Sequence, residues 1–302
     1  MNTIGHTFCL ISPLVSLLIL SSAADAADLI FAKGSKWELV STGHKFAEGM
    51  TWDRDGHFLF TDVPRSQLFR IDKDSGEKTL LDGKTRVANG IAFGPDKRLY
   101  GCAMRNGGVN TWDPESWEKE ILGDGVSAND LAILADGTIF FTDPPGESIW
   151  RIDPTTRERS LAAKLDWKPN GIGLSADEST LLVAEFEGSV VHGFAINKEN
   201  RLEEESRPAY RLAVPENGVG YLDGMQSLKD GRLLIGTSLG LQLAAPIHDK
   251  NTNPAIILVP PPEGRKRCNY VRISPDNQWI YTAYADDILR RRLIPNFGLG
   301  KE

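Results

Sequence analysis

Six polar side chains with oxygen donors recur at regular intervals along this 302-residue chain. Each begins a short apolar stretch, and the set comprises Glu48, Asn89, Asn129, Asn170, Asp223 and Asn269. Carboxylate and amide oxygens are the ligands that calcium prefers, whereas zinc and copper favour His or Cys, which this set lacks. Because buried oxygens without a partner are costly, we expect a divalent cation wherever the fold brings these side chains together.

The stretches that carry these residues are copies of one repeat. EGMTWDRDGHFLFTD from Glu48 and NGIGLSADESTLLVA from Asn170 both read as an apolar strand, an Asp-containing turn and a second strand. Successive copies start 41, 40, 41, 53 and 46 residues apart. A period near 40 with strand-type alternation is typical of propellers. The sequence therefore predicts an all-β, six-bladed β-propeller with four antiparallel strands per blade.

The first strand of each blade lines the axis of a propeller, so pseudo-symmetry places the six leading residues around one channel. A following Gly, as in Asn170-Gly171, permits close backbone approach there. An alternative is that Asn-Gly is only turn chemistry; this accounts for the Asn residues but poorly for Glu48 and Asp223. We also expect residues 37–41 and 288–293 to share a blade and close the ring.

Bulk composition narrows the possible partners and domains. The net charge of −7 argues against a nucleic-acid partner. Cys102 and Cys268 are too few for a disulfide framework, and their redox state stays open. With 41% hydrophobic residues the chain can build a sizeable core, and we expect residues 27–302 to form one domain.

Residues 1–26 read as a signal peptide. The apolar run at 8–20 is short for a membrane span, and Ala24-Asp25-Ala26 fits a cleavage site. We therefore expect an exported protein, periplasmic or secreted, with no stable membrane insertion after cleavage. The alternative is an uncleaved anchor.

The repeats resemble the senescence-marker-protein/gluconolactonase/regucalcin family of six-bladed propellers over roughly residues 40–295. The matching stretches are EGMTW, SANDLAILADGTIFFTDP, KPNGIGLSAD and YLDGMQSLKDGRL. The resemblance implies that a divalent cation, usually Ca²⁺ with Mg²⁺ or Mn²⁺ also possible, is held by Glu48, Asn129, Asn170 and Asp223. It also implies hydrolysis of lactones, and in some members of organophosphate esters.

The chain departs from that family in one position of interest. Ser127 stands where sugar-lactone members often carry Arg, two residues before Asn129. A sugar-acid lactone is therefore not assured as the substrate, and an enzyme acting on another sugar-derived carbonyl compound is an alternative.

These observations predict an exported, calcium-dependent hydrolase that opens a lactone or related ester. In this hypothesis the cation activates the carbonyl and water, and Asp223 is both ligand and general base. The alternative role for Asp223 is purely structural. We expect substrate contacts from Asn89, Arg105, Asn269 and Tyr284.

Other loop residues, namely Arg65, Asn106, Asp143 and Glu185, are expected on the same face. Residues 197–221 and 256–262 overhang it as a lid or are plain surface insertions. A second interpretation of the whole chain is a non-catalytic calcium-binding propeller that binds a small ligand or a protein.

Overall fold

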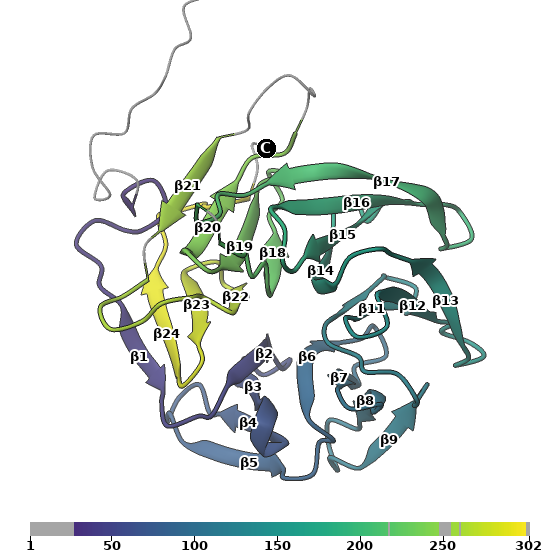
Figure 1. The fold of residues 1–302 in the computed structure, drawn as a ribbon. Coiled ribbons are helices and arrows are strands. Elements are labelled where there is room, and N and C mark those ends of the chain that lie inside the picture. Colours follow the sequence, from purple (N-terminus) through teal and green to yellow (C-terminus); the bar gives the residue numbers. More distant parts are fainter. Residues whose placement is uncertain (1–26, 217, 248–254, 260, 300–302) are drawn as a thin grey trace, which may run out of the picture.

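The computed structural model describes residues 27–216, 218–247, 255–259 and 261–299. Within these residues, six four-stranded antiparallel sheets are arranged around a central axis (Figure 1). The predicted six-bladed propeller is therefore confirmed. The expected signal segment, residues 1–26, lies outside the described residues.

The first three blades follow the expected repeat from the axis outwards. Blade one consists of β2 (Ala47–Trp52), β3 (Phe58–Asp62), β4 (Gln67–Ile71) and β5 (Lys78–Asp82). Blade two consists of β6 (Ala88–Phe93), β7 (Leu99–Ala103), β8 (Gly108–Trp112) and β9 (Lys119–Leu122). Blade three consists of β10 (Leu131–Ile133), β11 (Ile139–Asp143), β12 (Ser148–Ile152) and β13 (Arg159–Lys164).

The remaining blades repeat this order, except at the ring closure. Blade four consists of β14 (Pro169–Leu174), β15 (Thr180–Glu185), β16 (Val190–Ile196) and β17 (Leu202–Arg211). Blade five consists of β18 (Met225–Ser227), β19 (Leu233–Thr237), β20 (Gly240–Ala244) and β21 (Ile256–Val259). Blade six consists of β22 (Tyr270–Ile273), β23 (Trp279–Tyr284), β24 (Asp287–Arg292) and β1 (Glu38–Ser41).

Blade six joins the two ends of the described chain. Its outermost strand, β1, pairs antiparallel with β24, with Glu38 opposite Arg290. An ion pair between these two side chains, 3.0 Å from Nε to Oε2, adds to the ladder. The sharing of a blade by the segments near residues 37–41 and 288–293 is thus as predicted from sequence.

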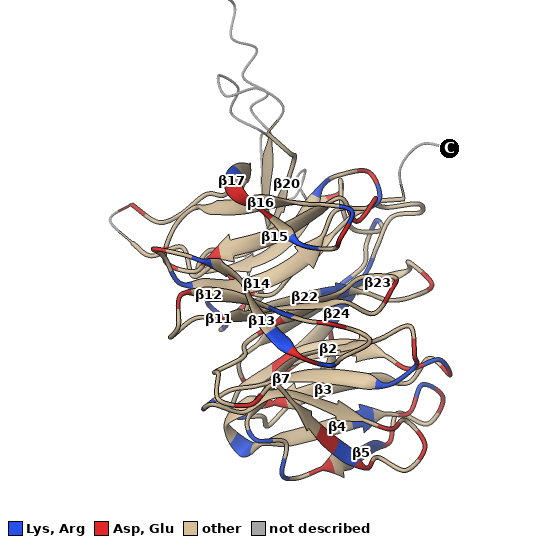
Figure 2. Cartoon of the chain, turned by 90° about the vertical axis from the view of Figure 1, so that its right-hand side faces the viewer, with Lys and Arg blue, Asp and Glu red and all other residues tan. Residues whose placement is uncertain are grey.

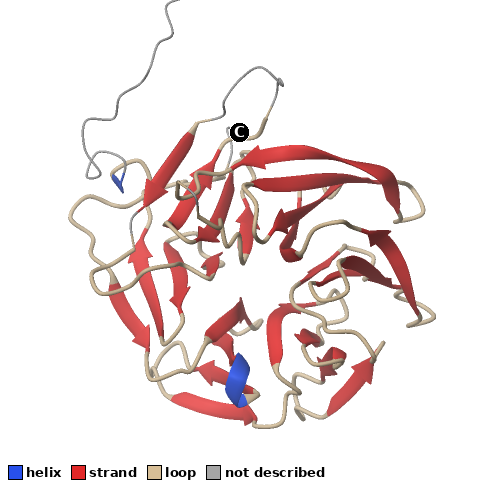
Figure 3. Ribbon diagram, in the orientation of Figure 1, coloured by secondary structure: helices blue, strands red, loops and turns tan. Residues whose placement is uncertain are grey.

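Helix is almost absent from the described residues. The 3₁₀ turn η1 (Val63–Arg65) follows β3, and the other helical backbone in the described residues is at Ala27 (Figure 3). No helix in this part of the chain is long and apolar enough to cross a bilayer. Lys, Arg, Asp and Glu alternate in sign over turns and outer strands on the face drawn in Figure 2.

Apolar side chains fill the interfaces between neighbouring blades. Leu59 and Leu68 of blade one pack with Ile91 and Trp112 of blade two, all fully or almost fully buried. Corresponding clusters occupy the other five interfaces. Since burying one such side chain contributes roughly 1.5–3 kcal/mol, each blade is stabilised mainly by its neighbours.

The inner strands of adjacent blades contact one another all the way round the axis. Four of the leading residues are followed by glycine: Gly49, Gly90, Gly171 and Gly224. A side-chain methyl at Gly171 would overlap the carbonyl oxygen of Asp223 in the next blade, and one at Gly49 would overlap that of Asn89. These glycines therefore set how closely the blades approach the axis.

Both cysteines of the described residues are free and buried, Cys102 in β7 and Cys268 just before β22. Burial raises the pKa of both thiols, that of Cys268 to about 12. Such thiols stay protonated and behave as small apolar core groups.

The two segments considered as a lid are mainly outer strands. Residues 202–211 form β17 and residues 256–259 form β21, each the fourth strand of its blade. The extra length of the fourth repeat lengthens the outer edge of blade four, so of the two alternatives these strands fit plain additions to the blade edges and not a lid. At the end of the first segment, the Tyr221 ring packs 5.3 Å from that of Phe186, which lines the cavity described below.

Replacing Gly171 by Ala should lower the free energy of unfolding by about 1–3 kcal/mol, the usual cost of overpacking. The new methyl would meet the backbone of Asp223, which cannot move without shifting blade five. Urea denaturation measures the effect. Gly173→Ala in the same strand is the matched control, because its nearest contact is an ordinary 3.6 Å to Ser227 Oγ. Equal stability of the two variants would refute the close-approach argument.

Candidate metal and substrate site

The six leading residues all lie at or just before the start of an inner strand. Glu48, Asn89 and Asn170 are the second residues of β2, β6 and β14, while Asn129, Asp223 and Asn269 precede β10, β18 and β22. All six are buried, none more than 8% exposed. The repeat therefore places them at a similar depth at one end of the channel.

Five of the six line one cavity of about 320 Å³. They are Glu48, Asn89, Asn129, Asn170 and Asp223. Arg105, Arg267 and a set of largely apolar side chains complete the walls, the latter being Phe46, Val63, Pro64, Val87, Met104 and Phe186. The cavity thus has an oxygen-rich floor and apolar sides, as small-molecule sites commonly do.

Backbone hydrogen bonds hold the leading residues in position. Thr142 Oγ1 in blade three donates to the carbonyl oxygen of Asn170 in blade four at 2.7 Å. Thr61 Oγ1 makes the equivalent bond to the carbonyl oxygen of Asn89 at 3.0 Å. Because these main chains are fixed from the neighbouring blade, the side chains are left to face the axis.

The carboxylates of the site crowd one another. Burial raises the pKa of Glu48 well above its usual value, and the negative charges of Asp223 and Asp130 raise it further. Burial likewise raises the pKa of Asp223 to about 7, with Asp130 adding to the shift and Arg267 opposing it. Two acidic groups and two amides that converge in this way suit a divalent cation, since its charge would offset the repulsion.

Arg267 is a site residue that sequence reasoning missed. It lies in the connection between β21 and β22, and its Nη2 donates to Asp223 Oδ2 at 2.7 Å. Nothing in the repeat marks it, because it lies in a connection between blades, outside the six repeated stretches. The available signal was the basic run Arg265-Lys266-Arg267 just before Asn269.

A second polar network, also missed, closes the channel beneath the cavity. Tyr270 of blade six donates its hydroxyl to Asp130 Oδ1 of blade three at 3.0 Å, directly across the ring. Arg272 Nη2 donates to the same Tyr270 oxygen at 2.8 Å. Asp130 replaces the glycine found after the leading residue in four repeats, which was the available sequence signal.

Asn269 does not line the cavity. Its Nδ2 donates to the carbonyl oxygen of Ala47 at 2.7 Å, and its Oδ1 accepts from the backbone N–H of Ala285 at 2.9 Å. Both halves of the amide are thus used to join blade six to blade one. Asn269 therefore links two blades and does not line the cavity, where a substrate contact was expected.

Tyr284 also lies elsewhere, because its ring packs in the apolar core between blades five and six and is 2% exposed. Arg105 does line the cavity, as expected for a substrate contact. The other loop residues considered are not part of the lining: Arg65, Asn106, Asp143 and Glu185.

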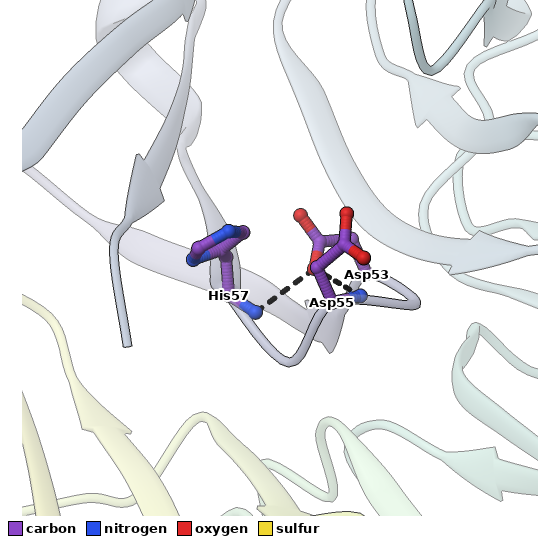
Figure 4. Close-up of side chains that lie close together, drawn as sticks. All are labelled: Asp53, Asp55 and His57. Atoms are coloured by element: carbon purple, nitrogen blue, oxygen red, sulfur yellow. Dashed lines mark hydrogen bonds between the residues drawn. The ribbon is translucent and has the colours of Figure 1, made fainter. Parts of the chain in front are cut away.

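Another acidic group, Asp53, Asp55 and His57, lies in the turn after β2 (Figure 4). Asp53 Oδ1 accepts the backbone N–H groups of Asp55 at 3.0 Å and of His57 at 2.8 Å. This turn follows the end of β2 opposite Glu48, about 16 Å along the strand. Its contacts are those of a hairpin turn, and it is separate from the axial cavity.

Fold and site together define a class: a six-bladed propeller with an acidic and amide-lined centre at one end of its channel. The sequence pattern of the SMP-30/Gluconolactonase/LRE-like region matches residues 46–245. This chain belongs to that family.

Individual relatives of this chain are distant in sequence. A gluconolactonase of Zymomonas mobilis subsp. mobilis is 25% identical over 257 residues, covering 72% of each chain. The lactonase drp35 of Staphylococcus aureus is 25% identical over 179 residues, and the match spans about half of each protein, 54% of this chain and 55% of that one.

Solved structures share the fold. A gluconolactonase from Xanthomonas campestris superposes with a TM-score of 0.75 at 22% identity, over 89% of this chain and 93% of that one. The calcium-binding protein regucalcin from Agrobacterium tumefaciens gives 0.69 at 14% identity, over 90% and 98%. At these identities the likeness concerns the fold alone.

Asn269→Ala should lower the free energy of unfolding by about 1–3 kcal/mol for each buried backbone group that loses its partner. Those groups are the carbonyl of Ala47 and the N–H of Ala285. Urea denaturation is the measurement. Asn89→Ala is the matched control, because the Asn89 amide faces the cavity and its Nδ2 contacts Met104 Sδ at 3.9 Å. An equal cost for both variants would contradict the structural place given to Asn269.

The raised pKa of Asp223 also has a pH signature. Because it is about 7 in the folded protein and about 3.9 in an unfolded chain, the folded state binds more protons between these values. In chelator, the free energy of unfolding of the wild type relative to Asp223→Asn should therefore fall as pH rises from about 4 to about 7. Denaturation series of both proteins test this, and a flat or rising difference would contradict the crowding of carboxylates.

Proposed function

We propose that this protein is a hydrolase that opens a lactone or related ester with the help of a divalent cation at the propeller axis. The observation that carries the proposal is the convergence of four oxygen-bearing side chains on one cavity, namely Glu48, Asn129, Asn170 and Asp223. The names of the relatives, a gluconolactonase and a lactonase, support the same reaction class. Fold likeness alone would not choose a function.

Those four side chains are the proposed cation ligands. Two carboxylates and two amides, without nitrogen or sulfur donors, suit Ca²⁺ best, with Mg²⁺ and Mn²⁺ as alternatives. When bound, a divalent cation polarises a carbonyl and favours ionisation of a water molecule. The apolar walls lower the polarity around a bound substrate, which strengthens electrostatic effects on it.

The protein's own groups orient the reactants. Asp223 is the proposed general base, with Oδ2 held by Arg267 at 2.7 Å. In the net reaction the hydroxyl of a water molecule bonds to the lactone carbonyl carbon and the ring C–O bond breaks. The water proton passes to the departing ring oxygen, so the product is a hydroxy acid. Asn89 and Arg105 line the cavity and are the proposed positioning groups.

Export completes the proposal. The apolar run at 8–20 and the Ala24-Asp25-Ala26 site support a cleaved signal and a periplasmic or secreted enzyme. Immunoblotting of cell fractions, with amino-terminal sequencing of the mature protein, tests this directly.

Turnover should depend on both cation and base. With Ca²⁺ present, a panel of sugar, aliphatic and aromatic lactones should include substrates whose hydrolysis releases protons, and chelator should abolish it. Asp223→Ala should lower kcat by about 10²–10⁴-fold, the usual contribution of a general base. A folded protein that binds Ca²⁺ without turnover would overturn the hydrolase proposal and favour the non-catalytic calcium-binding propeller.

The cation should stabilise the protein through the axial side chains. At a Ca²⁺ concentration of about 100 Kd the free energy of unfolding should rise by about 2.7 kcal/mol, seen as an increase in Tm. Glu48→Gln should abolish most of that increase by removing one charge. Asp55→Asn, in the exposed turn cluster, is the matched control and should keep it. If only Asp55→Asn lost the increase in Tm, the cation-binding site would have to lie in the turn instead of at the axis.

A further inference from the structure

Arg267 has a more specific place in the cavity than a counter-ion needs. Its guanidinium reaches in from the β21–β22 connection and binds Asp223 through Nη2. The Arg267 side chain is 31% exposed, whereas that of Asp223 is 4% exposed. The Arg267 guanidinium thus lies at the mouth of the cavity, between its buried floor and solvent.

Three aromatic rings surround this guanidinium. Arg267 Cζ lies 5.0 Å from the ring centre of Tyr221, 5.8 Å from that of Phe46 and 5.9 Å from that of Phe186. These rings come from three different parts of the chain: Phe46 precedes blade one, Phe186 lies between β15 and β16 of blade four, and Tyr221 precedes blade five. Cation–π contacts from several sides restrict the side chain to a narrow range of positions, which lowers the entropy cost of binding a ligand.

Three of the fifteen non-glycine residues with left-handed φ in the described chain lie near this rim. Tyr221, Val87 and Arg105 hold left-handed φ values of 46°, 61° and 55°. This conformation is unusual for non-glycine residues and an outlier for a β-branched one such as Val87. Strain of this kind persists where the surrounding structure enforces it, commonly at ligand sites. The rim is therefore built to aim particular side chains, not merely to cover the channel.

Arg267 also has donor capacity to spare. A guanidinium carries five N–H donors, and Asp223 accepts from one nitrogen, Nη2. Within the described part of the chain, Nε is buried and has no hydrogen-bond partner. Carboxylate and phosphate are oxyanions whose paired oxygens match such a fork.

The charge of the cavity favours the same kind of ligand. Its charged lining consists of two carboxylates, Glu48 and Asp223, and two guanidinium groups, Arg105 and Arg267. These formal charges cancel, and Asp130 beneath them is opposed by Arg272. The divalent cation of the proposed function would then leave an excess of positive charge in a site with apolar walls.

We propose that Arg267, with Arg105 on the same cavity, binds an oxyanion group carried by the substrate, so that the preferred lactone bears a carboxylate or phosphate besides its ring ester. This inference rests on the proposed function and adds the substrate class to it. Arg267 is thus a specificity-determining residue, and hydrolysis of such a lactone yields a product with one more carboxylate.

The test compares matched lactones. Glucaro-1,4-lactone carries a carboxylate and is compared with neutral glucono-1,4-lactone, while 6-phosphoglucono-1,5-lactone carries a phosphate and is compared with neutral glucono-1,5-lactone. The wild type should have a higher kcat/KM for one of the two anionic lactones than for its neutral counterpart, and which of them is preferred identifies the oxyanion. Arg267→Met should lower the ratio of anionic to neutral kcat/KM by about 10- to 100-fold, mainly through KM.

Arg265→Met is the control. Arg265 belongs to the same connection, pairs with Asp287 outside the cavity and is 26% exposed, similar to Arg267. It should leave the ratio unchanged. Calorimetric titration with glucarate, with 6-phosphogluconate and with neutral glucitol, in the presence of Ca²⁺, gives a readout without turnover. The wild type should bind at least one of the two anions more tightly than glucitol, and Arg267→Met should lose that preference.

The outcomes separate the two proposals. Turnover of neutral lactones with no anionic preference, or an equal loss on all lactones in Arg267→Met, would overturn the role of Arg267 and leave the hydrolase intact. Arg267-dependent binding of glucarate or 6-phosphogluconate without turnover of any lactone would retain the anion site and overturn the hydrolase.

Discussion

The close backbone approach of six inner strands is the constraint on which the rest of this structure depends. Where Gly171 meets the carbonyl of Asp223, there is no room for a side chain. That contact, with threonine hydroxyls such as that of Thr142 holding the next blade's carbonyl, fixes the radius of the ring. The functional side chains then have one direction left, toward the axis, so the position of the site follows from how the blades pack.

The same compression creates the electrostatic problem that the site must solve. Among three buried carboxylates, Asp130 and Asp223 lie close enough to Glu48 to raise its pKa, and Asp130 also raises that of Asp223. Tyr270 and Arg272 lie beneath the cavity and compensate Asp130. Arg267 lies at the cavity mouth and binds Asp223. A divalent cation between these two layers would be held by oxygens whose own repulsion favours its binding. The site is therefore best understood as a stack of alternating charges along the axis.

The periodic part of this organisation could be predicted from the sequence, and the aperiodic part could not. The repeat identified the blades and placed Glu48 and Asn170 at the axis, because six similar units can pack only in one way around it. Asn269 shares the pattern, but its amide hydrogen-bonds to backbone groups. This difference arises from the neighbours of Asn269 and not from its own repeat. Arg267 meets Asp223 across 44 residues of sequence and Tyr270 meets Asp130 across 140, so neither contact can be recognised from the local sequence.

Closing the ring through the pairing of β1 with β24 has a consequence for how the molecule is made. The ion pair between Glu38 and Arg290 spans 252 residues of sequence, so blade six cannot be completed until nearly the whole chain has emerged from the ribosome. Contacts of such sequence separation are slow to form. A chain that crosses a membrane unfolded would have the time this requires. Slow closure is a liability for a protein that must fold where it is synthesised. For the export proposed above, it would keep the polypeptide in a form that can still be threaded through a translocation pore.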